Sequence, residues 1–292
     1  MVGNLEELKE YTPFYRALNE PRYIRRDFLE KIKDVFKVDW VISYISPSRP
    51  IDDVDPIVFQ DILYHIKGKV ESMLLILHSN GGSPDVAEKL VEIMRDTSKH
   101  LYVVIPEKAK SAATILSLGA DKIYMLENAE LGPIDPQIRL KEDLWRPAQS
   151  IVDGVFGLIS LLEGKDQINP GIAILLQHID PATIDFAFKT IERAKTLAAR
   201  LIENYMLKGE KEKAIEIAET LSKVSEHLSH GRPIRWREAE EIGLVVDRIP
   251  RENEEHDLIW RYFAYALVYM GDTGKHKLFE SPKASIALPP NR

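Results

Sequence analysis

Short apolar runs alternate with helical patterns through the first half of this chain, and that alternation restricts the fold more than any other feature. The runs that predict strands are residues 39–45 (DWVISYI), 73–78 (MLLILH), 101–105 (LYVVI) and 122–125 (KIYM). Each is almost continuously apolar, as expected of parallel strands covered by helices on both faces. Residues 58–66 and 84–95 carry apolar side chains at helical spacing. The pattern predicts βαβ units in an α/β core.

The rest of the chain predicts additions to that core. Residues 181–206 have the apolar stripe of one long helix, and residues 243–249 (GLVVDRI) have the pattern of a returning strand. We therefore expect five segments. They are an N-terminal helical segment (1–35), the core (36–147), a helical insertion (148–225), a closing helix–strand unit (226–250), and a C-terminal helix with a mobile, proline-containing tail (251–292).

Charge and composition exclude several classes of protein. Lysine and arginine total 39 against 46 aspartates and glutamates, and the net charge of −7 argues against a protein that binds nucleic acid by neutralising phosphates. The absence of cysteine excludes disulfides and thiolate chemistry. No apolar run approaches the about 18 residues of a membrane span, and the charged N-terminus has no signal-peptide core. We expect a cytoplasmic protein without a transmembrane segment.

The first candidate site lies in LHSNGGSPD, where a buried strand runs into Gly81 and Gly82 and then into a helix. Glycines at such a turn let backbone N–H groups face a site without an intervening side chain, and N–H groups near a helix N-terminus stabilise anions. The alternative is a plain strand-to-helix turn that needs positive φ. Neither a Walker loop nor a GxGxxG pattern is present, so we expect no nucleotide cofactor.

The second candidate lies in EKAKSAATILSLGAD, where a strand ends and a helix of small residues begins near Ser111. A serine at this kind of turn can be a nucleophile, or it can simply cap the helix. Gly82 and Ser111 are separated by enough chain for one helix and one returning strand. Both turns then lie at the carboxyl ends of neighbouring parallel strands, where α/β sheets build their sites. The N–H groups of Gly82 and Ala112 would form an oxyanion hole beside the Ser111 hydroxyl.

Together, SNGG, KSAATILSLGADKIYM and AELGPIDPQ resemble the Clp-protease/crotonase superfamily of serine peptidases. The nearest branch is the one called serine dehydrogenase proteinase, related to signal peptide peptidase A. The resemblance spans about residues 25–250 and includes SPSRPIDDVD and HGRPIRWREAEEIGLVVD. It implies a ClpP/crotonase-like repeated ββα sandwich with a helical insertion and a helical tail. It also implies that Ser111 is the nucleophile and that Gly81, Gly82 and Ala112 supply the oxyanion hole.

The general base does not follow from the resemblance, because this chain departs from both family patterns. Asp135, in GPIDPQ, stands near the place where the Clp proteolytic subunit has a histidine, and no lysine matches the one that signal peptide peptidase A uses. His230, in SHGRPI, lies where the superfamily places a third triad member, and Asp135 would orient it. The alternative interpretations are a loop histidine and a turn aspartate. Other candidates are Lys110, Lys165 and His178, each of which also suits a surface or helix-end position.

Histidines and carboxylates do not cluster at metal-ligand spacing, so no metal site is predicted. The aromatic tail helix WRYFAYALVYM and the stripe on 181–206 indicate contacts with further copies of the chain, or else an ordinary internal core. The sequence therefore predicts a homo-oligomeric serine endopeptidase acting on peptides or proteins. The alternatives are an acyl-CoA hydrolase or isomerase of the crotonase type, and a catalytically inactive scaffold.

Overall fold

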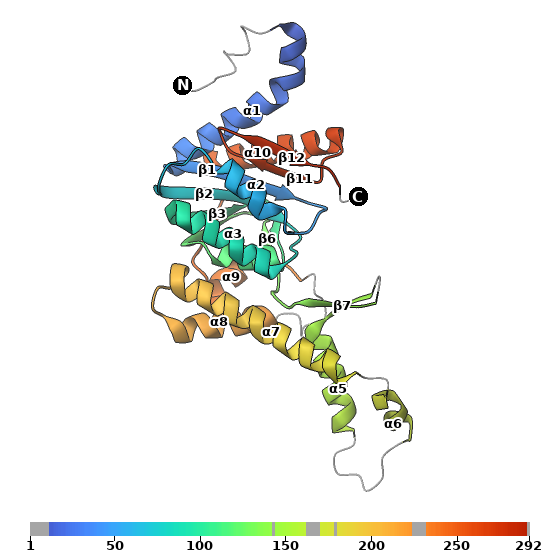
Figure 1. Ribbon diagram of the computed structural model, residues 1–292. Coiled ribbons are helices and arrows are strands. Elements are labelled where there is room, and N and C mark those ends of the chain that lie inside the picture. The colour runs from blue at the N-terminus through green and yellow to red at the C-terminus, as the bar shows by residue number, and fades with distance from the viewer. Residues whose placement is uncertain (1–11, 142–143, 162–169, 178–179, 224–231, 291–292) are drawn as a thin grey trace.

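A mixed β-sheet forms the centre of the molecule (Figure 1). The computed structural model describes residues 12–141, 144–161, 170–177, 180–223 and 232–290. In this part of the chain ten strands join one sheet, whose main path runs β10-β5-β3-β2-β1-β11-β12. Strands β1, β2, β3, β5 and β10 are parallel, and β11 and β12 continue the sheet in antiparallel pairing. The predicted α/β core is confirmed.

The strands of the main path are β1 (Trp40–Ser46), β2 (Val70–Ser79), β3 (Ser98–Ile105), β5 (Lys122–Leu126), β10 (Val246–Ile249), β11 (Lys277–Glu280) and β12 (Ser285–Leu288). A short side ladder, β4 (Lys108–Ala109), β6 (Glu130–Leu131) and β9 (Ile234–Arg235), branches from the end of β2. A separate hairpin consists of β7 (Gln137–Lys141) and β8 (Leu144–Pro147). The four predicted strand runs correspond to β1, β2, β3 and β5.

The helices around the sheet are α1 (Pro13–Phe36), α2 (Asp55–Ile62), α3 (Pro84–Thr97), α4 (Ala112–Leu118), α9 (Trp236–Ile242) and α10 (Glu254–Thr273). The helical insertion contains α5 (Ala148–Ser160), α6 (Pro170–Gln177), α7 (Pro181–Leu201), a π-type segment (Ile202–Met206) and α8 (Lys211–Lys223). Figure 1 shows α5 and α6 extending away from the sheet. Local signals explain several helix ends: Ser83 caps α3 and Pro84 follows at its first turn, while α9 ends at the left-handed Gly243.

Helices cover both faces of the sheet. Neighbouring strand residues point to opposite faces, and on β1 the Ser43 hydroxyl meets Tyr262 of α10 while the Tyr44 hydroxyl donates to Asp55 of α2. Helices α10 and α2 therefore lie on opposite faces. Helix α1 packs against α10, and α3 packs against α2 and α4. The strands between these layers are almost wholly buried, which explains their continuous apolar sequence.

The end of the chain differs from the expected mobile tail. Strand β11 pairs with β1, β12 pairs back onto β11, and Leu278 and Phe279 are buried. The prolines and polar residues of SPKASIALPPNR suggested a loop, whereas its residues 285–288 form the edge strand β12 and the preceding KLFE forms β11, between β1 and β12. The C-terminal hairpin is therefore part of the core.

Candidate active site

The turn from β2 into α3 is built on two glycines in conformations that other residues rarely adopt. Gly81 has φ +100° and Gly82 has φ +151°. The Ser79 hydroxyl accepts the N–H of Gly81 at 3.1 Å and so holds the start of the turn. Ser83 ends the turn, because its hydroxyl accepts the N–H of Val86 as the helix cap.

Gly82 lies directly against the backbone of Ile51. Ile51 donates its N–H to the Gly81 carbonyl at 2.8 Å and accepts the N–H of Ser83 at 2.9 Å. A Cβ atom on Gly82 would lie 2.3 Å from the nitrogen of Ile51, closer than any real contact. The close approach therefore requires glycine. As a result, the segment that follows β1 fixes the path of the glycine turn.

The second turn places Ser111 in a strained conformation, with φ +51° and ψ −118°, at the start of α4. For a non-glycine residue this backbone region costs about 1–3 kcal/mol and is retained only where the surroundings impose it. The predicted alternative of an N-cap does not hold, because the Ser111 side chain makes no capping hydrogen bond. Ser111 is half-buried, and its side chain faces a cavity.

The structure brings the two turns into contact, as the strand order predicts. Ser79 pairs with Ala109, and the N–H of Lys110 donates to the Ser79 carbonyl at 3.0 Å. A Cβ atom on Gly81 would lie 2.9 Å from the Cβ of Ser111. The N–H groups of Gly82 and Ala112 donate no hydrogen bond to any other described residue. Within the described part of the chain, neither N–H group is therefore committed to another contact.

A cavity of about 560 Å³ opens at Ser111. Its walls are mainly apolar, and they come from the segment after β1, both turns, the segment before β7, and α7. The lining residues are Pro50, Ile51, Asn80, Gly82, Ser83, Pro84, Ser111, Ala112, Ile115, Ile134, Pro136, Gln137, Thr190, Arg193, Ala194 and Leu197. Of these, the four α7 residues were missed by sequence reasoning, which assigned the stripe on that helix to core or oligomer contacts.

Buried polar contacts hold the Ser111 turn in place. The Thr114 hydroxyl lies 2.8 Å from the Ala109 carbonyl oxygen and 2.9 Å from that of Gly132, and it accepts the N–H of Gly132 at 3.1 Å. Thr114 is fully buried. The first turn of α4 is thereby tied to both β4 and the segment that leads to Asp135.

Lys110 is held away from the cavity. Its Nζ lies 2.7 Å from Oε1 of Glu130 and donates to the Leu131 carbonyl at 3.2 Å. Its stem packs closely on Gly132, where an added Cβ would lie 2.6 Å from the Lys110 Cδ. Lys110 is not among the residues that line the cavity. In this arrangement its ammonium neutralises Glu130 rather than facing Ser111.

The candidates for the base have different outcomes. Asp135 is buried, with 1% of its surface exposed, between two residues that line the cavity, Ile134 and Pro136. His230, Lys165 and His178 lie outside the described residues. Among the residues that are described, no histidine, lysine, aspartate or glutamate lines the cavity.

The described residues contain neither a candidate metal site nor a candidate membrane span. No group of three potential ligands there could hold a metal ion. No helix in the described ranges is both long and apolar enough to cross a membrane.

Two curated relatives of this chain are uncharacterized proteins of Methanocaldococcus jannaschii. One is 33% identical over 179 residues, covering 61% of this chain and 54% of the relative. The other is 28% identical over 196 residues, covering 66% of this chain and 59% of the relative. The chain therefore spans less than two thirds of the length of either relative.

Similar solved structures include two proteases. ClpP1 from Listeria monocytogenes is 15% identical, with a TM-score of 0.42 over 75% of this chain and 95% of that chain. The 1510-N membrane-bound stomatin-specific protease, solved with a serine-to-alanine substitution, is also 15% identical, with a TM-score of 0.41 over 70% of this chain and 77% of that chain.

A family of serine peptidases matches the part of the chain that contains the site. The match covers residues 51–262, which is more than half of the chain and includes both turns, the helical insertion and every residue of the cavity lining except Pro50. The α/β sheet agrees with the ClpP-like fold that the resemblance implied. This protein therefore belongs to the ClpP-like SDH-type serine proteinase family.

Proposed function

We propose that the chain cleaves peptide bonds through an acyl-enzyme intermediate on Ser111. The observation that carries this proposal is the contact of the two turns. It places a strained serine beside Gly81 and leaves the N–H groups of Gly82 and Ala112 without partners among the described residues. A nucleophile close to two N–H donors that no other group occupies is suited to acyl transfer.

In the proposed mechanism, the Ser111 Oγ attacks the scissile carbonyl while a base accepts its proton. The carbonyl oxygen becomes an oxyanion, which the N–H groups of Gly82 and Ala112 stabilise. The leaving amine then takes the proton from the base, and the acyl group stays on Ser111. A water molecule, deprotonated by the same base, hydrolyses this ester and restores the serine.

We propose His230 as the base and Asp135 as the residue that orients it. Support comes from the described residues on either side of the segment that contains His230. The carbonyl of Leu221 accepts the N–H of Ile134 at 3.2 Å, and Ile234 pairs with Leu131. Both flanks therefore contact the segment that contains Asp135 and borders the cavity.

The cavity walls favour a substrate with an apolar side chain next to the scissile bond. Ile51, Ile115, Ile134 and Leu197 form much of the lining, and Arg193 is paired with Asp85 at 2.5 Å. Removing an apolar side chain from water contributes about 25 cal/mol per Å² of buried surface.

A fluorophosphonate probe tests the nucleophile and the base. We expect the wild-type protein to form one covalent adduct, which peptide mass spectrometry locates on Ser111. Ser111→Ala abolishes the adduct, and His230→Ala slows its formation by about 10²-fold or more, the usual contribution of a general base. Lys110→Met should label at close to the wild-type rate if its role is to neutralise Glu130.

Ser83→Ala is the matched control, because Ser83 lines the same cavity but has ordinary backbone angles and caps α3. It should still be labelled on Ser111. An adduct on Ser83, or full labelling of Ser111→Ala, would show that the nucleophile has been assigned wrongly. Normal labelling of His230→Ala alongside loss in Lys110→Met would transfer the role of base to the lysine. Hydrolysis of an acyl-CoA thioester by folded Ser111→Ala would favour the crotonase-type alternative.

A further inference from the structure

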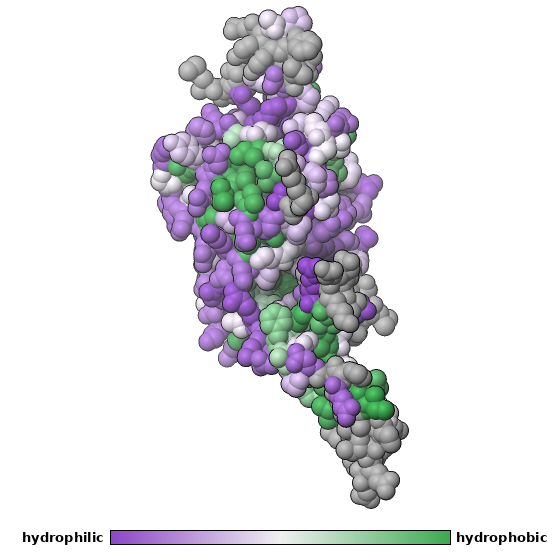
Figure 2. Space-filling model, turned by 45° about the vertical axis from the view of Figure 1, so that its right-hand side comes forward, coloured by the Kyte–Doolittle hydropathy of each residue, from purple (hydrophilic) through white to green (hydrophobic). Residues whose placement is uncertain are grey.

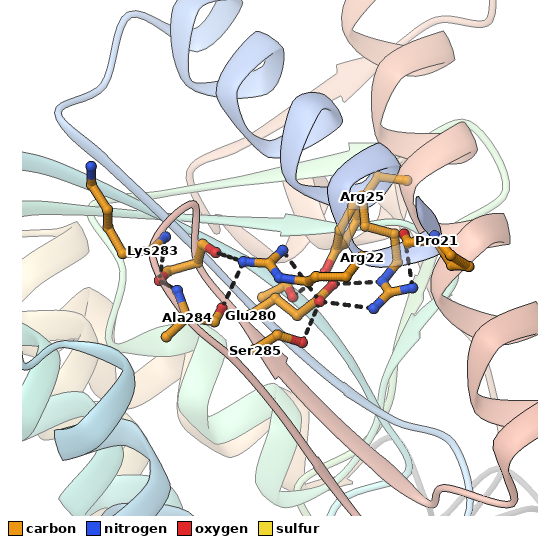
Figure 3. Close-up of polar contacts among 10 residues, drawn as sticks. Pro21, Arg22, Arg25, Glu280, Lys283, Ala284 and Ser285 are labelled. Atoms are coloured by element: carbon orange, nitrogen blue, oxygen red, sulfur yellow. Dashed lines mark hydrogen bonds and ion pairs between the residues drawn. The ribbon is translucent and has the colours of Figure 1, made fainter. Parts of the chain in front are cut away.

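Strand β11 carries two buried ionic clusters, one on each face of the sheet. Glu280 points toward α1, where both of its carboxylate oxygens accept hydrogen bonds from Arg25, at 2.9 Å and 3.1 Å (Figure 3). Lys277 points toward α2, where its Nζ donates to Oδ1 of Asp55 at 2.5 Å. Lys277, Asp55 and Glu280 are each fully buried. The β11 side chains at the centre of the two clusters are equally buried, but Lys277 contacts α2 and Glu280 contacts α1.

The Lys277 cluster organises the segment that follows β1. The Lys277 Nζ also lies 3.1 Å from Oδ1 of Asp52. The second oxygen of Asp55 accepts the backbone N–H of Asp52 at 2.9 Å and the hydroxyl of Tyr44 at 2.7 Å. Asp52 in turn pairs with Arg49 at 3.0 Å. Lys277 thus contacts Asp52 and Asp55 directly, and Asp52 extends the cluster to Arg49, so the ion pairs hold residues 49–55 together.

Residues 49–55 also hold the glycine turn between β2 and α3 in place. Ile51, next to Asp52, exchanges backbone hydrogen bonds with Gly81 and Ser83 on either side of Gly82. Because these hydrogen bonds hold the residues on both sides of Gly82, we expect a shift of Ile51 to shift Gly82 as well. The contacts run without a gap from Lys277 through Asp55 and Asp52 to Ile51 and the glycine turn.

The Glu280 cluster differs, because the described side chains that contact Glu280 directly all lie outside residues 49–55. Its partners are Arg25 and Arg22 of α1, Tyr262 of α10 and Ser285 of β12. Arg22 also donates to the carbonyls of Ser281 and Ala284 in the turn between β11 and β12 (Figure 3). None of these residues lines the cavity. This cluster joins α1 to the C-terminal hairpin, on the face away from α2.

We propose that Lys277 is a positioning residue, through which the C-terminal hairpin sets the place of the Gly82 N–H in the oxyanion hole. The inference rests on the proposed peptidase function. Residue 277 lies beyond residues 51–262, the part of the chain that matches the family, so the hairpin adds an element to the site from outside that match. Burial raises the pKa of Asp55, and hydrogen bonds from Lys277 and Tyr44 oppose that rise, so the carboxylate depends on its buried cation.

The test compares two double variants, each of which removes both partners of the fully buried ion pair in one cluster. Lys277→Met/Asp55→Asn removes the pair that faces the site, and Arg25→Met/Glu280→Gln removes the pair on the other face. Removing both partners avoids the large penalty of one unpaired buried charge, so both proteins should fold. Circular dichroism and urea unfolding establish the stability of each.

Two readouts then separate positioning from general stability. The first is the saturating rate of fluorophosphonate labelling at Ser111, which should fall by on the order of 10²-fold in Lys277→Met/Asp55→Asn, the usual cost of displacing a catalytic group. Its half-saturating probe concentration should stay near the wild-type value. The second is hydrogen exchange of the Ser83 amide, which donates to Ile51 and should exchange faster in this variant. Arg25→Met/Glu280→Gln should match the wild type in both readouts, even where its stability is lower.

The proposal is overturned if folded Lys277→Met/Asp55→Asn labels at the wild-type rate and its Ser83 amide exchanges as in the wild type. Equal losses in the two double variants would also overturn it, since they would show a general effect of stability. An absence of labelling in the wild-type protein would reject the peptidase function instead. In that case the exchange of the Ser83 amide alone decides whether Lys277 positions the turn.

Discussion

The Ser111 end of the sheet and the helical arm, defined as α5, α6 and the first half of α7, are packed in opposite ways. At the sheet end, glycines touch backbone, and Thr114 and Ser79 satisfy buried polar groups. In the described part of the arm, a small cluster of apolar residues is buried, and large apolar side chains are exposed on the lower part of the molecule (Figure 2). The exposed side chains are Phe156, Ile159, Leu161, Ile174, Leu175, Phe186 and Phe188.

The two regions therefore differ in how far the folded chain buries its own apolar side chains. Close packing at the sheet end fixes the geometry of the proposed site. The exposed apolar side chains of the arm are the kind of surface that other protein chains cover. The predicted homo-oligomer therefore remains a prediction, with the arm as its proposed contact. The experiments that follow test the contrast between the two regions.

The largest effect is expected from matched glycine substitutions. In Gly82→Ala the new Cβ would overlap the Ile51 backbone and displace one donor of the proposed oxyanion hole, so labelling at Ser111 should fall by about 10²-fold or more. In Gly154→Ala, within α5, the new Cβ meets nothing within 4 Å. Alanine should stabilise that helix by about 0.5–1 kcal/mol and leave labelling unchanged. Comparable labelling of the two variants would contradict the tight packing assigned to the sheet end.

A pH effect on stability is expected from His78, which is buried on β2 against Phe263. Burial, with a smaller effect of Lys108, lowers the pKa of His78 from 6.5 to about 4, although a Glu107 carboxylate oxygen lies 3.3 Å away. Between these values the unfolded chain binds the proton and the folded chain does not. The free energy of unfolding should therefore fall by about 3 kcal/mol as the pH drops from 6.5 to 4.

Urea unfolding across that pH range measures the effect, and His78→Leu is the control. The leucine variant cannot titrate at this position, so its stability should depend less steeply on pH. The expectation is wrong if the free energy of unfolding of the two proteins depends equally on pH between 6.5 and 4. His78 would then be protonated in the folded state, with the Glu107 carboxylate stabilising its charge.

A smaller effect is expected from a pair of hydroxyl deletions. Thr114→Val removes the buried hydroxyl that ties α4 to Ala109 and Gly132, which should lower the free energy of unfolding by about 1–3 kcal/mol. Ser160→Ala, in the arm, removes an exposed hydroxyl that bonds the Phe156 carbonyl at 2.9 Å. Its effect should stay within about 0.5 kcal/mol. Thermal unfolding compares the stability of the two variants. If Thr114→Val is as stable as the wild type, the Ser111 turn does not depend on the hydrogen bonds of the Thr114 hydroxyl.

The smallest effect on stability is expected in the arm itself. Phe156 is 52% exposed and Phe59, in α2, is 2% exposed. Phe59→Ala should cost about 3–5 kcal/mol, whereas Phe156→Ala should change the stability of the monomer by less than about 0.5 kcal/mol. Sedimentation velocity should show Phe156→Ala shifted toward smaller species. Unchanged assembly with a large loss of stability would mean that the arm packs on its own chain.

Much of the candidate site was predictable because its signals are local. Two glycines after an apolar strand, and a serine before a small-residue helix, mark strand ends in a βαβ pattern, and strand order then brings Gly81 and Ser111 together. The surroundings of the site were less predictable. Nothing in the apolar stripe of α7 distinguishes residues that line a cavity, such as Ala194, from residues that fill a core. Lys110 was a candidate base from sequence, and only its contact with Glu130 gives it another role.

The sequence by itself determined the alternating strands and helices, the positions of the two turns and the need for glycine at one of them. These features depend on residues near one another in the chain, and local periodicity and backbone preference specify them. The tertiary structure alone decided the positive φ of Ser111, the cavity wall formed by α7 and the pairing of β11 with β1. It also decided the contact between Lys277 and Asp55, which are 222 positions apart. Contacts at such a distance depend on how whole layers pack, and no local pattern encodes them.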